Sequence, residues 1–400
     1  MIIYLPFVHN IYRRMISDEK FILMNSDVII IGGGIIGLNI ARNLRQKGVK
    51  KITILERGSV GREASHAAAG MLAPQAETNK IDPFFHFCDQ SNQLYPKFAD
   101  ELLAETGIDI ELERSGTLYL AFTENDVKEI RRRYEWQKAA GLKIDHLTAE
   151  EARKAEPFVS PDVREALFFP NDWQVENRQL ISALHRFADI NDIEIITNTE
   201  VKSLLVKNGK VFGAETQNHK FFAEKVGLAT GAWTSLIKID HFNLPLVKPM
   251  RGQMLKFQTA KRLFSHVIYS PRGYVVPRLG GKILAGATTE DVGFENQITP
   301  NGINFVLSNA VEIAPSLANL AITEKWSGLR SFATDGLPIL GEFLEIKNLF
   351  IATAHFRNGI LLTPMTGKIM AEKIVNNTDS EYLEVFSPQL FEKQDLVVNC

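Results

Sequence analysis

The stretch that decides the fold runs from Asp27 to Glu56 and reads DVIIIGGGIIGLNIARNLRQKGVKKITILE. It opens with four consecutive β-branched residues, Val28 to Ile31, which are typical of a strand buried on both faces of a parallel sheet. After the glycines, an apolar residue recurs at every fourth position from Ile36 to Leu44, which predicts a helix. A second apolar run follows at Ile52 to Leu55. Strand, glycine turn, helix and strand within about 30 residues predict a βαβ unit.

The glycine turn carries a phosphate-binding pattern. Gly32, Gly34 and Gly37 satisfy G-x-G-x-x-G, in which the first glycine makes the tight turn, the second lets the backbone approach a pyrophosphate, and the third permits close helix packing. Glu56 ends the second strand, where its carboxylate can accept hydrogen bonds from ribose hydroxyls and would repel a 2′-phosphate. The pattern therefore predicts a dinucleotide with an unphosphorylated ribose, either NAD or FAD.

Composition narrows the class of protein. The chain has 400 residues, which suggests two or three domains, and its 45 basic and 47 acidic residues leave a net charge of −2. Such a balance offers no field for nucleic acid or an anionic membrane, so neither is an expected partner. The two cysteines, Cys88 and Cys400, cannot build a disulfide framework or a cysteine zinc site. We therefore expect a cytoplasmic protein without a metal site.

The N-terminus is the least regular part of the sequence. No run of 18 apolar residues occurs anywhere, so no membrane-spanning helix is expected. The apolar start of residues 1–24 precedes Arg13 and Arg14, whereas a secretory signal has its basic residues first. We interpret this segment as an extension ahead of the folded part.

Further along the chain, two textures alternate. Strand-like runs occur at 193–196, 211–214 and 225–230, and residues 349–376 return to strand, glycine turn and helix. Between Leu246 and Ala287, alternating runs separated by proline and glycine predict an antiparallel sheet. The fold class is therefore mixed α/β, with a cofactor domain built from separated pieces and a second domain inserted between them.

Three stretches of small residues extend the candidate site beyond the glycine turn. They are Arg62–Leu72 (REASHAAAGML), Ala229–Trp233 (ATGAW) and His355–Leu362 (HFRNGILL). The first would let backbone lie against a flat ring system, and the third places a glycine turn before a helix, where a helix N-terminus could hold negative charge on a flavin ring. Read alone, the alanine run favours a tightly packed helix.

Taken in order, these motifs resemble the D-amino-acid-oxidase-like flavoproteins, most closely their glycine oxidase branch. The resemblance covers close to nine tenths of the chain and includes IGGGIIG with Glu56, AAAGML, GLR with DGLPILG from Gly328 to Gly341, and HFRNGILL. It implies a Rossmann-like FAD-binding domain with an inserted antiparallel-sheet substrate domain. The implied pieces are an extension at 1–25, FAD-binding segments at 26–80, 165–240 and 326–385, substrate-binding segments at 81–164 and 241–325, and a tail at 386–400.

The resemblance also implies roles for individual residues. Arg330 matches the arginine that grips the substrate carboxylate, as a guanidinium fork does through two parallel hydrogen bonds, Tyr274 matches a tyrosine that meets the same carboxylate, and Arg357 matches a second arginine of the pocket. No histidine is assigned as a general base. The residues implied to contact FAD are Gly32, Gly34, Ile35, Ile36, Gly37, Glu56, Arg57, Ser65, His66, Ala67, Ala68, Gly70, Met71, Val201, Thr230, Gly231, Trp233, Gly328, His355, Arg357, Asn358, Gly359, Ile360 and Leu361.

The mode of flavin attachment is expected to be non-covalent. Some relatives link FAD to a late cysteine, but no cysteine lies between Gly328 and Leu362. Others use a histidine just before an alanine-glycine run, and His66 stands one residue too far from Gly70 for that geometry. Because a covalent bond tolerates no such shift, dissociable FAD is the expected state.

The implied activity is oxidation of glycine and other small amines, such as sarcosine or short D-amino acids, to an imine and then a keto acid. Oxygen would be the electron acceptor and hydrogen peroxide a product, and the imine could supply thiazole formation in thiamine synthesis. Two alternatives stay open: a dehydrogenase that passes electrons to another acceptor, and a non-catalytic flavin-binding accessory subunit. A homo-oligomer is compatible with the sequence.

Overall fold

The first strand, β1 (Asn25–Ile31), is buried on both faces, as its β-branched residues predict. Successive side chains of a strand point to opposite faces, so Val28 and Ile30 pack into one core while Ile29 and Ile31 pack into another. The structure is a computed structural model that describes residues 25–392. Residues 1–24 of the expected extension and 393–400 of the expected tail lie outside the described residues.

The glycine turn leads into the expected helix, α1 (Ile35–Gln46). Close packing explains two of its glycines. At Gly32 the backbone has φ +110°, and a Cβ there would overlap the carbonyl oxygen of Ala229; at Gly37 a Cβ would overlap the carbonyl oxygen of Gly32. Glycine at both positions is what lets α1 start directly beside β1.

Eight strands form the first sheet, which is parallel through its centre. The order is β17-β18-β11-β1-β2-β8, and β10 pairs with β11 and with β9. The pairs β1–β11, β1–β2, β2–β8 and β11–β18 are parallel, which requires crossovers such as α1 between β1 and β2. The strands besides β1 are β2 (Ile52–Leu55), β8 (Glu194–Ile196), β9 (Val201–Lys207), β10 (Lys210–Thr216), β11 (Lys220–Leu228), β17 (Ile339–Glu342) and β18 (Leu349–Thr353).

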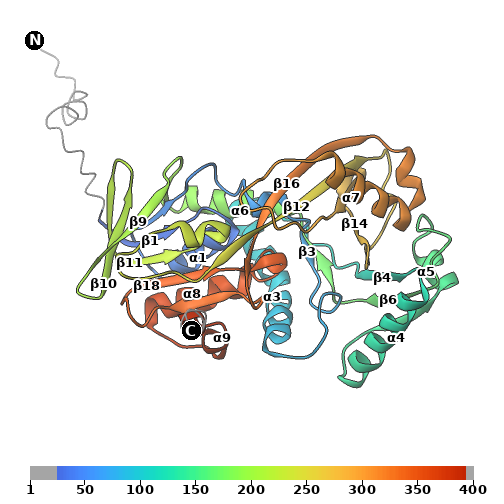
Figure 1. Ribbon diagram of the computed structural model, residues 1–400, viewed down its shortest axis with the longest axis horizontal. Coiled ribbons are helices and arrows are strands. Elements are labelled where there is room, and N and C mark those ends of the chain that lie inside the picture. Colours follow the sequence, from blue (N-terminus) through green and yellow to red (C-terminus); the bar gives the residue numbers. More distant parts are fainter. Residues whose placement is uncertain (1–24, 393–400) are drawn as a thin grey trace, which may run out of the picture.

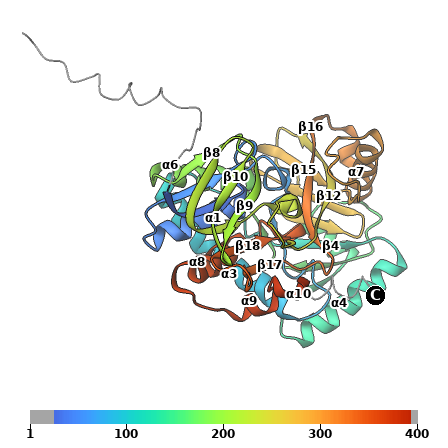
Figure 2. The same ribbon diagram turned by 60° about the vertical axis from the view of Figure 1, so that its left-hand side comes forward.

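Eight further strands form the second sheet, in the order β16-β12-β15-β14-β13-β4-β6-β5. The antiparallel arrangement expected between Leu246 and Ala287 is confirmed by the β12–β15 and β14–β15 pairs, whereas β13 runs parallel to β4. The strands are β4 (Thr117–Ala121), β5 (Asp145–Thr148), β6 (Glu165–Phe169), β12 (Val247–Gln258), β13 (Val267–Ser270), β14 (Gly273–Pro277), β15 (Lys282–Gly286) and β16 (Ile322–Ala333). Figures 1 and 2 both show this sheet, coloured teal to orange, beside the blue and green strands of the first.

Helices cover both sheets. Against the first sheet pack α1, α3 (Pro83–Thr106), α6 (Asn177–Ile190) and α8 (Thr363–Asn376), and their apolar faces share one core. The remaining elements are α2 (Ala64–Ala67), α4 (Glu124–Ala139), α5 (Ala149–Ala155), α7 (Pro300–Ile313), α9 (Glu381–Val385), α10 (Gln389–Glu392), the short pair β3 (Met71–Leu72) and β7 (Trp173–Gln174), and the 3-10 turns η1 (Gly231–Leu236), η2 (Leu279–Gly281), η3 (Pro315–Asn319) and η4 (Phe356–Asn358). Within residues 25–392, no helix has the length and hydropathy needed to cross a bilayer.

Two strands of the second sheet lie at the piece boundaries that the resemblance implies: β6 begins at residue 165, and β16 runs across residue 326. β6 pairs with β4 and β5 in the second sheet, although residues 165–240 are expected in the FAD-binding part. β16 begins at Ile322 and pairs with β12 along its length. Sheet membership depends on which strand lies alongside, and sequence spacing does not report that.

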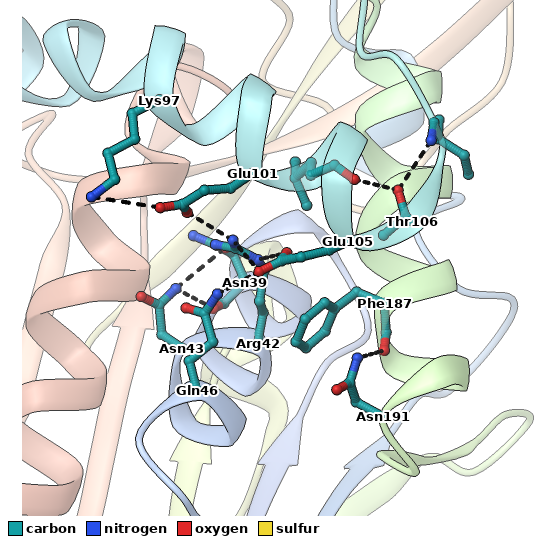
Figure 3. A network of polar contacts seen from close by, with 12 residues as sticks. Asn39, Arg42, Asn43, Gln46, Lys97, Glu101, Glu105, Thr106, Phe187 and Asn191 are labelled. Carbon is teal, nitrogen blue, oxygen red and sulfur yellow. Dashed lines mark hydrogen bonds and ion pairs between the residues drawn. The ribbon is translucent and has the colours of Figure 1, made fainter.

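A buried arginine ties three helices together beneath the first sheet. Arg42 of α1 is 2% exposed and lies between the rings of Phe98 and Phe187, 5.4 and 5.6 Å from their centroids. Its guanidinium also pairs with Glu101 and Glu105 of α3, each at 2.8 Å (Figure 3). α1, α3 and α6 are therefore fixed to one another through a single side chain.

Candidate functional site

The N-terminus of α1 opens onto a cavity of about 620 Å³ between the two sheets. Its N-cap, Gly34, has no side chain to satisfy the first amides of the helix, and Ser65 Oγ accepts from only one of them, that of Ile35, at 3.1 Å. Unsatisfied amides at a helix N-terminus attract phosphate oxygens through their N–H groups and the helix dipole. This end of the cavity therefore suits a pyrophosphate.

Glu56 lies at the end of β2, beside that helix N-terminus. One carboxylate oxygen accepts from the amide of Gly33 at 2.7 Å and the other from the amide of Gly58 at 2.8 Å. These two bonds fix the carboxylate, which lines the cavity and is 7% exposed. A carboxylate oxygen has a second lone pair, so Glu56 can still accept from ribose hydroxyls.

Most residues that the sequence assigns to the site line this one cavity. Those that do are Gly32, Gly34, Ile35, Ile36, Glu56, Arg57, Ser65, Ala67, Ala68, Gly70, Met71, Val201, Thr230, Gly231, Trp233, Tyr274, Gly328, Arg330, His355, Arg357, Asn358, Gly359 and Ile360. The fold brings them together from at least seven separate segments of the chain.

Three assigned residues lie outside the cavity lining. Gly37 packs behind the glycine turn, and Leu361 is 1% exposed in the helical core. His66 directs Nε2 toward the Nη1 atom of Arg62, 3.2 Å away. The structure thus places His66 in a position from which it does not line the cavity.

The small-residue run around α2 lies against the cavity because side chains hold its carbonyl groups from behind. Asn177 Nδ2 donates to the carbonyl of Ser65 at 2.8 Å, Trp326 Nε1 donates to that of Ala67 at 3.0 Å, and the buried Arg278 donates to that of Ala69. Gly328 completes the fit, since a Cβ there would overlap the Cβ of Ala67. A flat ring system can therefore lie directly on the backbone of this run.

None of these three donors is assigned to the site by the sequence. Each acts through a backbone carbonyl, and such a contact leaves no residue pattern. The one sequence signal for this part of the site is the alanine run itself. The run is also compatible with a helix, and the structure has a helix there only over the four residues of α2.

His355–Leu362 contributes to the cavity differently from the expected helix N-terminus. Its lining part is the 3-10 turn η4 with Gly359 and Ile360, and α8 begins only at Thr363. The carbonyls of Ile360 and Leu361 accept from Tyr95 and Ser91 of α3, which fixes the turn from the side of the core.

His355 is buried and contacts the hydroxyl of Thr366 through Nε2 at 3.1 Å. Burial without a neighbouring acid lowers its pKa to about 3. The imidazole is therefore neutral near pH 7, which agrees with assigning no histidine as a general base.

The far end of the cavity holds Arg330 and Tyr274. Arg330 lies flat against β12, where a Cβ on Gly252 would overlap its guanidinium, and Nη1 donates to the carbonyl of Thr288 at 3.0 Å. No carboxylate of the described residues forms an ion pair with it, and burial lowers its pKa. Tyr274 is also buried, and its hydroxyl lies 3.1 Å from Met254 Sδ. A buried guanidinium and a phenol hydroxyl thus line the same cavity, and this donor set suits a carboxylate.

Arg357, the second assigned arginine, is already paired. Its Nη2 donates to Glu77 Oε1 at 2.8 Å and to the Tyr269 hydroxyl at 2.6 Å. The carboxylate of Glu77 raises the pKa of Arg357, so this cation is fixed in the charged state. The sequence assigns neither Glu77 nor Tyr269 to the site, although both line the cavity.

These observations fit FAD. The amides of α1 and the carboxylate of Glu56 match a pyrophosphate and a ribose, the backbone around α2 leaves room for a flat ring, and Arg330 and Tyr274 lie beyond it in the same cavity. Arg57 stacks on Trp233, with its guanidinium carbon 3.6 Å from the ring centroid, on the wall near Glu56.

Comparison with known proteins gives one consistent answer. A family model described as FAD dependent oxidoreductase (DAO) matches residues 27–373. The glycine oxidase of Geobacillus kaustophilus is 34% identical over 364 residues, which cover 90% of this chain and 96% of that protein. The crystal structure of glycine oxidase from Geobacillus kaustophilus superposes with a TM-score of 0.86 at 33% identity and covers 91% of this chain and 98% of that one.

A longer relative matches equally well. The bifunctional protein ThiO/ThiG of Trichormus variabilis is 35% identical over 376 residues, which are 93% of this chain. The chain spans only 56% of that relative's length.

Proposed function

The chain belongs to the family of FAD-dependent oxidoreductases of the D-amino-acid-oxidase type, and from this premise we propose that it oxidises glycine and other small amines. FAD is the cofactor of the family, and we propose that it is held without a covalent bond. The single observation that carries the substrate class is Arg330, a buried guanidinium on the cavity wall for which residues 25–392 provide no ion-pair partner. A buried charge of this kind is stable only when a ligand of opposite charge joins it, so the substrate carries a carboxylate.

The proposed reaction converts glycine to iminoglycine with loss of two electrons and two protons. Water then hydrolyses the imine to glyoxylate and ammonia, and the two electrons and two protons reduce dioxygen to hydrogen peroxide. Bound FAD supplies the two-electron oxidant. The imine is also a reasonable precursor for thiazole formation in thiamine synthesis, in line with the ThiO part of the longer relative's name.

The residues of this chain act by binding and orientation. Arg330 would hold the carboxylate through two parallel charge-assisted hydrogen bonds, and the Tyr274 hydroxyl, which lies 3.1 Å from Met254 Sδ, would turn toward the same group. With the carboxylate held there, Arg330 would orient the Cα–H of the substrate toward a flavin ring bound on the backbone of residues 67–70. Positioning of this kind supplies much of the barrier lowering in a reaction whose chemistry belongs to the cofactor.

No acid or base in the cavity is needed for the carbon–hydrogen step. His355 is neutral and contacts the Thr366 hydroxyl through Nε2, and Glu77 is paired with Arg357. The substrate amine must instead be deprotonated, either before binding or in the cavity, because only a neutral amine stabilises the developing imine.

The test is anaerobic bleaching of the holoenzyme's flavin absorbance with glycine, sarcosine, D-alanine and D-proline. We expect at least glycine and sarcosine to bleach the flavin, and admission of air to restore its colour with one hydrogen peroxide per bleached flavin. No bleaching by any of the four would contradict the proposal. Bleaching without reoxidation by air would point to a dehydrogenase with another acceptor.

A further inference from the structure

We propose that Glu77 limits the substrate to one carboxylate, because it holds Arg357 and so removes the second cationic receptor of the cavity. The inference rests on the proposed function, since it concerns the substrate of the same site. It names a specificity-determining residue and predicts that loss of its charge opens the cavity to dicarboxylic amines.

Glu77 is the partner of Arg357 on the cavity wall. Oε1 accepts from Arg357 Nη2 at 2.8 Å, and the Tyr269 hydroxyl, itself 2.6 Å from the same Nη2 atom, lies 3.4 Å from Oε1. All three side chains line the cavity that also contains Arg330. The carboxylate therefore occupies the edge of Arg357 that a second substrate carboxylate would need.

Apart from Arg330, the other cationic side chains that line the cavity are also paired with carboxylates of the protein. Arg57 pairs with Glu63, Lys202 with Glu200, and Arg272 with Asp126 and Glu312. Arg357 pairs with Glu77. Among the cavity-lining residues in the described part of the chain, Arg330 is thus the one cation for which no ion pair is found, and it can neutralise one carboxylate.

The backbone that carries Glu77 is anchored on both sides of the peptide chain. The buried Asp172 accepts from the amides of Gln75 and Ala76 at 3.1 and 2.7 Å, and the buried Arg133 donates to the carbonyl of Ala76 at 3.0 Å. Glu77 follows directly on these residues, so its Cα has little freedom to withdraw from the cavity.

A dicarboxylic substrate would meet two costs at this wall. Its second carboxylate would approach the charge of Glu77, whose side chain is only 15% exposed, and like charges repel strongly where water screens them poorly. Displacing Glu77 from Arg357 instead would leave a largely buried carboxylate without its partner, which is also unfavourable. Specificity against dicarboxylates therefore comes from a repulsive element beside an attractive one.

The substitution Glu77→Gln tests the charge alone, because glutamine has nearly the same shape and keeps an acceptor for Arg357. Sarcosine and iminodiacetate are the matched substrates: both are N-substituted glycines, and they differ by one carboxylate. We expect the ratio of kcat/KM for iminodiacetate over sarcosine to rise at least tenfold in Glu77→Gln. The control variant Glu77→Asp keeps the negative charge and should leave that ratio within about threefold of the wild type.

In Glu77→Gln, the charge of Arg357 is no longer neutralised by a carboxylate, so Arg357 must be the group that receives the second substrate carboxylate. The double variant Glu77→Gln/Arg357→Leu should therefore lose the gain for iminodiacetate. An unchanged ratio in Glu77→Gln, or a gain that persists without Arg357, would overturn the proposal.

A binding measurement separates this inference from the proposed activity. Acetate and malonate, which differ by one carboxylate, can be titrated into the holoenzyme and followed by the change in flavin absorbance. We expect the wild type to bind acetate more tightly than malonate and Glu77→Gln to shift the ratio of the two Kd values at least tenfold toward malonate. If the Kd ratio shifts but neither glycine nor sarcosine is oxidised, the proposed function alone is refuted. If both are oxidised normally but the Kd ratio does not shift, the role of Glu77 is refuted. If Glu77→Gln does not fold, equal wild-type kcat/KM values for iminodiacetate and sarcosine would overturn the inference.

Discussion

Arg330 and Arg357, which line the same cavity, differ in their partners. Arg330 is buried, and its partners in the described part of the chain are neutral, namely the carbonyl of Thr288 and the neighbouring Tyr274, while Arg357 is paired with Glu77. The first is costly unless a ligand arrives, and the second is satisfied by the protein itself. The two side chains therefore have different roles although they line the same cavity.

Replacement of Arg330 is the most direct test of carboxylate binding. In Arg330→Leu the apparent KM for glycine should rise at least ~30-fold, since truncating one member of a buried hydrogen-bonded charge pair costs about 2–5 kcal/mol. Steady-state kinetics measure this, and the flavin spectrum should show that FAD stays bound. Arg330→Lys keeps the charge without the planar fork, so its KM for glycine should lie between those of the wild type and Arg330→Leu. Wild-type kinetics in Arg330→Leu would refute the carboxylate role.

The neutral state of His355 predicts sensitivity to acid. Burial lowers its pKa to about 3, from 6.5, so the imidazole contributes stability that is present above pH 6.5 and lost as the pH falls toward 3. The loss amounts to about 1.4 kcal/mol per pH unit in that window. Urea unfolding should therefore show that the free energy of unfolding of the wild type falls between pH 7 and pH 5. In His355→Gln this fall should be smaller by about 2 kcal/mol. Equal drops in both proteins would show that His355 is not the group responsible.

Sequence patterns reach these residues unequally. Arg330 and Tyr274 stand in motifs that resemble a known family, so their positions could be predicted. Glu77 and Tyr269 stand in no motif, and 192 residues separate them along the chain. Their contact exists only because Asp172 and Arg133 fix the turn before Glu77 at the same wall as β13.

At the level of elements, short repeating patterns carry most of the information. The buried strand, the glycine turn and α1 follow from residues that are close in sequence, and β2, β8, β11 and β18 lie where apolar runs predict them. The placement of β6 and β16 in the second sheet follows from pairing with β4 and β12, which are far away along the chain. Such pairing depends on long-range packing, and local patterns do not contain it.

The contact of α1 with α3 and α6 gives a prediction for stability. Arg42→Leu removes the ion pairs to Glu101 and Glu105 and the stacking between Phe98 and Phe187. We expect the free energy of unfolding to fall by about 3 kcal/mol, near the lower end for breaking a buried ion pair, because the two carboxylates keep 39% and 26% of their exposure.

Urea unfolding of Arg42→Leu and of Glu101→Gln measures that effect, and the second variant should lose much less because Glu105 still pairs with Arg42. Arg42 lies outside the cavity lining, so KM for glycine should not change in the variant that folds. A changed KM with unaltered stability would contradict the structural role.

The whole molecule is organised around the cavity between its two sheets. The cavity is lined by residues of the first sheet, at the part proposed for the pyrophosphate and ribose, and by residues of the second sheet, which include Arg330 and Tyr274. Arg178 of α6 also pairs with Glu324 of β16, and together with Lys256 it lowers the pKa of Glu324 to about 2. The cofactor would thus lie between parts that the protein also joins directly, through Trp326 with Ala67 and through Arg278 with Ala69.

Removal of FAD should destabilise the molecule as a whole. A ligand that binds only the folded state adds about 2.7 kcal/mol at a concentration 100 times its Kd. The apoprotein should therefore melt at a lower temperature than the holoenzyme, and added FAD should restore the melting temperature in a concentration-dependent way. Thermal melts with and without FAD measure this, and a melting temperature that is independent of FAD would argue against a dissociable cofactor.

The sequence by itself determined the βαβ unit, the glycine turn with Glu56 and the class of dinucleotide, and, through resemblance, the family; it also supplied Arg330 as the candidate for the substrate carboxylate. These follow from local spacing, because strand, helix and turn preferences act over a few residues. Only the tertiary structure decided that Asn177, Trp326 and Arg278 hold the small-residue run from behind, and that Glu77 occupies Arg357. Those contacts join side chains to backbone or to partners far away in sequence, and their energy exists only once the two sheets are packed together.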